Sequence, residues 1–181
     1  MSAKRVRPIL IEWALVCVLH AQASAQVEPT NRPPGCGGSN ADIPEPWHVW
    51  SGTPIAVTAA ISPAVEAKIA AGTKAAVTLA PAAAVRMAVT MPDTNPPPDA
   101  HSGMLSFQVP NDGIYWVSVS TGLWVDVVQG GKIVMEADER PGPRCSNINK
   151  SLEYRLRAGE ARIQLSDNRG ARVDLLVVRQ P

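Results

Sequence analysis

Short runs in which apolar and polar residues alternate, separated by turn residues, follow one another along the chain from about residue 55. In 152–157 Leu, Tyr and Leu alternate with charged residues, and in 161–166 three apolar residues alternate with Arg, Gln and Ser. A period of two is typical of strands that bury one face and leave the other in water. The pattern predicts an all-β fold, a single antiparallel β-sandwich of the jelly-roll type.

The predicted strands are 55–60, 74–79, 85–90, 104–109, 114–120, 124–129, 132–136, 151–157, 161–166 and 171–179. Gly130 and Gly131 predict a two-residue hairpin between two of them, and the last three strands predict a meander of antiparallel neighbours. Proline is common in the first turn of a helix and glycine is common just after its end, so Pro63 and Gly72 predict a short helix over 63–71. The prolines of 92–99 predict an exposed, stiff loop.

The chain begins with a different pattern. Lys4, Arg5 and Arg7 precede the apolar stretch 9–19, and small residues end at Ala25. This order is typical of a secretory signal peptide, here 1–25, and predicts a periplasmic or secreted protein.

The signal peptide has alternatives. Glu12 interrupts the apolar stretch, and an uncleaved anchor remains the competing interpretation, although a membrane span needs about 20 apolar residues. Lipidation of Cys17 is disfavoured because bulky Val16 precedes it. Residues 26–46, rich in Pro and Gly, predict a flexible lead-in, and 47–181 predict the sandwich domain.

Cleavage would remove three of the 17 basic and one of the 16 acidic residues and leave a net charge of −1. This balance gives no support to a nucleic-acid partner or to an anionic membrane partner. Cleavage would also leave two cysteines, Cys36 and Cys145, in a compartment where disulfides persist. We predict a bond between them, because neither a C-x-x-C motif nor a nearby histidine points to redox chemistry or metal binding.

Motifs for catalysis are missing from the sequence, which predicts no catalytic residue, no cofactor and no metal site. His48 and His101 lie in different segments without a second ligand at a recognisable spacing. Glu136, Asp138 and Glu139 would suit a calcium ion, but a solvated loop needs the same charges.

Aromatic side chains are the best candidates for ligand binding, since exposed rings stack on sugars and other flat ligands. The candidates are Trp47, His48, Trp50, Trp116 and Trp124. Large apolar residues are scarce, with one Phe in the chain, so the core competes for most of these rings.

Two polar features complete the candidates. Arg155, Arg157, Arg162 and Arg172 would share one face of the predicted meander, where a patch for an anionic partner competes with an ordinary solvated face. The triplet at 149–151 matches the glycosylation acceptor pattern, which is common by chance.

The stretch from Phe107 to Val178 resembles a family of small exported bacterial proteins of unknown function. The resemblance rests on the run Trp-Val-Asp-Val-Val at 124–128 and on the loop Gly-Pro-Arg-Cys at 142–145, and Cys36 matches a family cysteine. The resemblance implies a sandwich, a disulfide and a Gram-negative periplasmic setting. Some members carry the label homogentisate 1,2-dioxygenase, which implies an iron held by two histidines and a carboxylate.

The leading functional hypothesis is a non-enzymatic binding or interaction module with a protein or carbohydrate ligand. The alternatives are an enzyme of the dioxygenase label and a structural component of the cell envelope. An enzyme is disfavoured because His48 and His101 give an iron no converging set of ligands.

Overall fold

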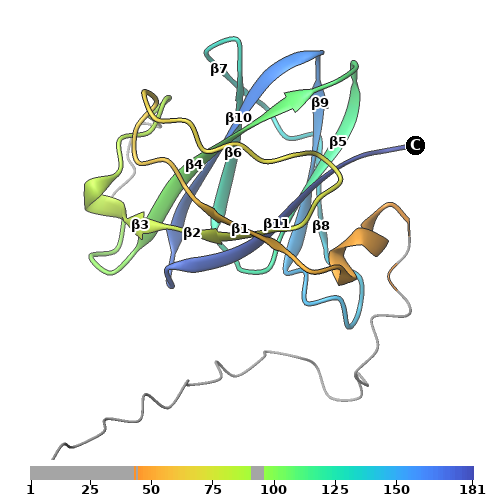
Figure 1. Ribbon diagram of the computed structural model, residues 1–181, viewed down its shortest axis with the longest axis horizontal. Helices are drawn as coiled ribbons and strands as arrows, with labels where there is room; N and C mark the ends of the chain where they lie inside the picture. The colour runs from red at the N-terminus through yellow and green to blue at the C-terminus, as the bar shows by residue number, and fades with distance from the viewer. Residues whose placement is uncertain (1–42, 44, 91–95) are drawn as a thin grey trace, which may run out of the picture. The chain divides into compact units, whose positions relative to one another are not determined.

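The computed structural model describes residues 43, 45–90 and 96–181. The chain divides into two compact units, Met1–Thr30 and Asn31–Pro181, and all described residues belong to the second. The signal peptide and most of the lead-in therefore lie outside the described residues. Figure 1 shows the second unit as strands in two layers. No helix in the described ranges is both long enough and apolar enough to cross a membrane.

The described strands form two sheets. The six-stranded sheet has the order β1 (Ile55–Thr58), β2 (Ala75–Thr78), β11 (Arg172–Arg179), β5 (Gly113–Val119), β9 (Lys150–Leu156), β8 (Asp138–Pro141). The five-stranded sheet has the order β3 (Ala80–Pro81), β4 (His101–Val109), β10 (Gly159–Asn168), β6 (Trp124–Gln129), β7 (Lys132–Val134). Among the neighbouring strands of the two sheets, only β1 and β2 run parallel to each other, and the other pairs are antiparallel. Two short 3-10 helices, η1 (Trp47–Ser51) and η2 (Ala82–Ala84), complete the elements.

The strand order is that of a jelly roll. The nested order is seen when β1, β3 and β8 are set aside. Of the strands that remain, the first pairs with the last, since β2 lies beside β11. The second pairs with the second to last (β4 with β10), the third with the third to last (β5 with β9), and β6 with β7 in the middle. One long antiparallel hairpin folded over on itself gives this nested order. The predicted all-β jelly-roll sandwich is confirmed.

Side chains from both sheets fill the space between them. The core includes Phe107 and Tyr115, whose ring centroids lie 6.5 Å apart, and Tyr154, whose hydroxyl donates a hydrogen bond of 3.0 Å to the Val125 carbonyl. Gly103 of β4 packs closely against Ala59, because a Cβ at Gly103 would be 2.4 Å from the Ala59 Cβ. A larger residue at Gly103 would therefore displace the chain at Ala59.

Three sequence predictions are wrong. Residues 85–90 form no strand and 63–71 form no helix; in the latter segment Ile69 and Ala67 exchange backbone hydrogen bonds with Ser106 on the free edge of β4. The last three strands form no meander, because β9 pairs with β5 and β8, β10 with β4 and β6, and β11 with β2 and β5.

The Gly130–Gly131 hairpin is confirmed. Gln129 pairs with Lys132, and both glycines have positive φ, 59° and 74°, as a tight hairpin turn requires. The sequence did not predict β8, an edge strand that ends at Pro141. Proline suits an edge strand, because proline has no backbone N–H and an edge strand has a neighbour on one side only.

Candidate functional site

Three of the candidate aromatic rings lie on the outer side of the six-stranded sheet, beneath or within η1. Trp116 and Trp50 are only 1% and 2% exposed, and both belong to a second apolar cluster with Leu176 and Val178. Trp116 alternates with the core residue Tyr115, so it faces away from the sandwich core, but η1 covers it. These two rings present no face to a ligand.

The contacts of this second cluster show its structural role. Trp47 packs against Trp116 with ring centroids 5.5 Å apart, and its indole N–H donates a 2.9 Å hydrogen bond to the Ser118 hydroxyl. Lys74 lies 4.8 Å from the Trp50 ring centroid and Arg140 lies 4.9 Å from that of Trp116. The three rings therefore hold η1 on the sheet.

Trp124 differs from these rings, because its side chain is 60% exposed at the start of β6. The Lys150 ammonium lies 5.9 Å from the ring centroid. The Trp124 side chain also forms a hydrogen bond to the Asp126 carboxylate, and its indole N–H is the only donor it has. The exposed ring thus has a cation and a carboxylate as neighbours.

Asp126 shares the outer face of the five-stranded sheet with Trp124, since the two are separated by one residue of β6. Burial raises the pKa of Asp126 above its ordinary value, and the hydrogen bond from Trp124 opposes this rise. Among the ion pairs of the described ranges none includes Asp126. Its carboxylate has spare capacity to accept hydrogen bonds.

The neighbouring strand β10 supplies the other side chains of this face. In the antiparallel register Ser166 lies opposite Trp124, Gln164 opposite Asp126 and Arg162 opposite Val128. We call these six residues the Trp124 face. Residues on one face of paired strands are close enough to act on one ligand.

A groove of about 220 Å³ continues the Trp124 face toward the β6–β7 hairpin. Its lining comprises Ala88, Val89, Val128, Gly130, Gly131, Glu160, Ala161 and Arg162. Arg162 and Glu160 form a loose ion pair of 3.9 Å there. The groove thus adds a paired cation and carboxylate to the Trp124 ring and the Asp126 carboxylate.

One wall of the groove belongs to residues 82–90, which we call the strap. Gln164 fastens it: the Val89 N–H donates to the Gln164 amide oxygen and the Gln164 amide nitrogen donates to the Val89 carbonyl, both at 2.9 Å. The side chain thereby replaces a backbone partner, which explains why Gln164 is buried although it faces away from the core. The prediction that this position faces water is wrong.

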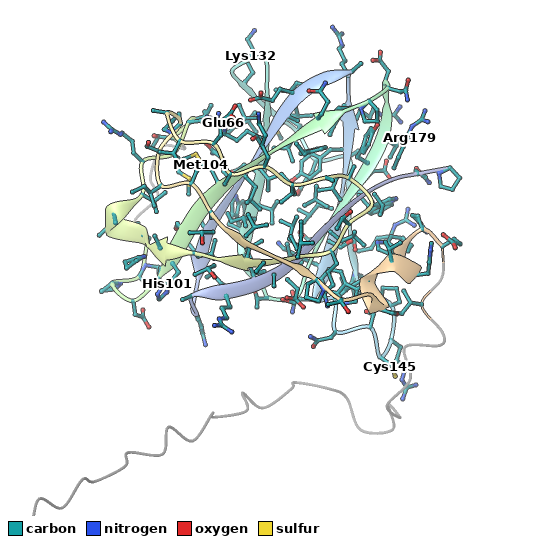
Figure 2. The ribbon with its side chains drawn as sticks, viewed as in Figure 1. Glu66, His101, Met104, Lys132, Cys145 and Arg179 are labelled. Atoms are coloured by element: carbon teal, nitrogen blue, oxygen red, sulfur yellow. The ribbon has the colours of Figure 1, made fainter. Side chains whose placement is uncertain are left out.

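The other candidates are dispersed. His48 is exposed on η1 and its Nδ1 lies 2.6 Å from a Glu45 carboxylate oxygen. Figure 2 shows His101 on the opposite side of the domain from η1, and its buried Nδ1 has no hydrogen-bond partner among the described residues. No three metal-binding side chains gather in the described part of the chain. The two histidines therefore do not converge on an iron.

The acidic loop is neutralised by neighbouring cations. Asp138 lies 2.7 Å from the Arg140 guanidinium and Glu139 lies 3.3 Å from the Lys150 ammonium. These pairs favour the solvated-loop interpretation over a calcium site. The predicted basic face is wrong, because Arg155 lies on β9 and Arg162 on β10, in different sheets.

Cys145 lies in the loop between β8 and β9, with a positive φ of 67°. Figure 2 shows it at the edge of the domain, on the same side as η1. Cys36 lies outside the described residues, so the bond between the two remains a prediction.

Comparisons with known proteins show no matching family model and no matching curated protein. Among solved structures the chain is similar to the pre-peptidase C-terminal domain of a collagenase from Bacillus anthracis, with 14% sequence identity and a TM-score of 0.35. The similarity covers 61% of this chain and 91% of that chain. A likeness this distant carries no functional argument, and the resemblance to exported bacterial proteins remains a prediction.

The sequence pointed to Trp124 but not to its neighbours Asp126, Arg162 and Ser166. Alternation along 124–128 places Trp124 and Asp126 on one face, so that pair was within reach of the sequence. Arg162 and Ser166 were not, because nothing local shows that β10 lies beside β6.

Proposed function

We propose that the protein is a non-enzymatic ligand-binding module and that the Trp124 face is its binding surface. The observation that supports this proposal is the exposed Trp124 ring, fixed by Asp126 on its own strand and by Lys150 beside it. A ring that is already ordered loses little conformational freedom when a ligand stacks on it, which favours affinity. Trp50 and Trp116 are used for packing and leave Trp124 as the available aromatic surface.

Binding arrays test this proposal. The mature protein is applied to an array of glycans and to an array of peptides, together with the variants Trp124→Ala and Ile55→Ala. Ile55 is a matched control, since it is also an exposed apolar residue but lies on the six-stranded sheet. We expect ligands that bind the wild type and Ile55→Ala but not Trp124→Ala. Binding that survives in Trp124→Ala, or no binding on either array, contradicts the proposal, and the latter favours a structural envelope component.

We also propose that the chain is exported, cleaved after Ala25 and closed by a bond between Cys36 and Cys145. Packing at the second cluster supports the pairing, because Ile43 and Ile148 both belong to it. Ile43 follows Cys36 by seven residues and Ile148 follows Cys145 by three, and seven residues of chain span at most about 25 Å. A mature N-terminus at Gln26 and no free thiol, both by mass spectrometry, are the expected results; an intact leader or two free thiols contradict it.

A further inference from the structure

We infer that the protein pairs with a second copy of itself through β1, an edge strand of the six-stranded sheet, so that two such sheets join across a two-fold axis at Val57. The inference goes beyond the proposed function, because β1 and the Trp124 face belong to different sheets. Three properties carry it: an edge without the usual protection, an uncharged surface around that edge, and free backbone groups that allow one register.

The four edges of the two sheets differ in how they exclude a further strand. The edge strand β7 has three residues and begins with Lys132, and β8 has three charged residues followed by Pro141. The short β3 ends at Pro81, and the edge of β4 beside it is bonded to Ala60 and to the segment 67–69. Charge, proline and covering segments are common protection of a sheet edge. In contrast, β1 has neither a charge nor a proline, and β2 is its one neighbour in the sheet.

The surface around β1 is uncharged and apolar. Residues 55–65, which we call the β1 wall, contain no charged side chain. Ile55, Ile61 and Val65 are 44%, 45% and 50% exposed, so three of the five exposed large apolar side chains of the described ranges belong to the β1 wall. Because Ala60 bonds to the edge of β4, the β1 wall runs from the edge of one sheet to the edge of the other. A charged peptide finds no complementary charge there, whereas an uncharged wall is complementary to itself.

Ala56 and Thr58 carry the free backbone groups of β1. The N–H groups of Ile55 and Ala59 donate to carbonyls of the chain at 74–78, each at 2.9 Å. Backbone groups alternate in direction along a strand, so those of Ala56 and Thr58 point away from β2. Both residues are exposed, and no strand of the described ranges lies on that side of β1.

These free groups fix one register for a second copy. Opposite residues of an antiparallel pair exchange two hydrogen bonds, so Ala56 opposite Thr58 of the second copy, and Thr58 opposite its Ala56, would use every free group. A shift of two residues in one direction places Thr58 opposite Pro54, which has no N–H. A shift in the other direction places Ala56 opposite Ala60, whose N–H and carbonyl both bond to Met104. The edge is therefore complementary to itself in one register only.

The same register matches the side chains. Val57 would lie opposite its own copy on the two-fold axis, and Ile55 would lie opposite Ala59 of the second copy. These three residues share the inner face of β1, where Val57 packs against the core and Ala59 belongs to it. Pairing would therefore join the cores of the two copies at Val57 and cover the exposed Ile55 side chain, which favours association.

The size of the contact predicts a weak dimer. A strand of five residues is about 17 Å long, and two packed sheets lie roughly 10 Å apart. A contact of these dimensions buries less than about 1,200 Å² in total, which is typical of transient complexes. The dimer should form at concentrations on the order of 100 μM and dissociate on dilution to about 1 μM.

Sedimentation velocity between about 1 and 500 μM tests the inference, with Ala56→Pro as the disrupting variant. Proline removes the N–H that faces the second copy and leaves the hydrogen bonds between β1 and β2 intact. We expect the wild type to dimerise and Ala56→Pro to weaken the dimer at least about fivefold, because two of the four hydrogen bonds lose their donor. Urea unfolding of Ala56→Pro should remain cooperative, and Trp124→Ala should dimerise as the wild type does.

A cysteine at the two-fold axis tests the register. Val57→Cys should give a disulfide-linked dimer with oxidised glutathione, because Cα atoms at such a position lie about 4.5 Å apart, within the range that a disulfide bridges. Thr53→Cys is the matched control. It lies four residues before the axis, so its two copies would be too far apart to form a disulfide.

Three results would overturn the inference. They are a wild type that stays monomeric over the whole range, a dimer that Ala56→Pro leaves unchanged, and equal cross-linking of Val57→Cys and Thr53→Cys. The first of these results would leave the β1 edge to a strand of another protein. None of them bears on ligand binding at Trp124, so the inference and the proposed function can fail separately.

Discussion

Replacing Gln164 with alanine should release the strap from the five-stranded sheet. The Gln164 amide makes both hydrogen bonds that a backbone partner would make with Val89, each at 2.9 Å. Without that amide, the N–H and carbonyl of Val89 lose their partners on the outer face of β10. The groove beside the Trp124 face would then lose the wall that Ala88 and Val89 form.

The expected cost is about 1–3 kcal/mol, since each hydrogen bond contributes a net 0.5–1.5 kcal/mol to stability. Gln129 provides a matched control. Its side-chain amide makes the same pair of bonds with the Arg157 backbone, at 2.7 and 3.0 Å, but at an exposed place where water can replace it. Gln129→Ala should therefore cost less than about 1 kcal/mol.

Two measurements check the magnitude and its location. Urea unfolding gives the total loss of stability, and amide hydrogen exchange by NMR gives the opening of the strap itself. For a loss of 2 kcal/mol, exchange of the Val89 amide should accelerate about 30-fold in Gln164→Ala. If the Val89 amide exchanges as slowly in Gln164→Ala as in the wild type, the side chain does not fasten the strap and the reasoning fails.

Three further predictions concern the core and the rings. Burial raises the pKa of the Tyr154 phenol, so on raising the pH the unfolded chain loses that proton first and the stability of the fold decreases above pH 10. Tyr154→Phe should cost about 1 kcal/mol at pH 7 and should remove that part of the decrease, as measured by urea unfolding at pH 7 and above pH 10. Gly103→Ala should cost about 1–3 kcal/mol through its clash with Ala59, and the double variant with Ala59→Gly should recover part of it; additive costs would contradict that contact. Trp116→Ala should cost about 3–5 kcal/mol but Trp124→Ala less than about 1 kcal/mol, and equal losses would refute the division between packing and binding rings.

Most strands could be predicted from the sequence because alternation is a local property. The strand Trp124–Gln129 has the predicted bounds, and the alternation of Leu152, Tyr154 and Leu156 does mark the buried face of β9. Strand neighbours could not be predicted in the same way. In a jelly roll β10 pairs with β4, whose partner residues precede it by fifty or more positions, while the adjacent β9 lies in the other sheet. A meander was the simplest local interpretation and tertiary pairing overrode it.

The segment 63–71 shows a second limit of local reasoning. Its Ala, Glu and Lys residues favour a helix, and Pro63 and Gly72 lie where helix ends would place them. The free edge of β4 offers hydrogen bonds to the extended form instead, and the segment bonds to Ser106 there. Propensities of a few tenths of a kcal/mol per residue are too small to outweigh an unpaired sheet edge.

The scarcity of large apolar residues gives the exposed Trp124 its weight as a functional candidate. In a chain with one Phe, the core is completed by small aliphatic residues together with Tyr115 and Tyr154, and the covering of the six-stranded sheet uses Trp47, Trp50 and Trp116. A further large ring in water adds little to the stability of this fold, because little of its surface is removed from solvent. It nevertheless has Asp126 and Lys150 as neighbours that can restrict its rotation. An exposed ring is what stacking on a ligand requires, so the measurements on Trp124→Ala bear on the function more directly than any change in the core.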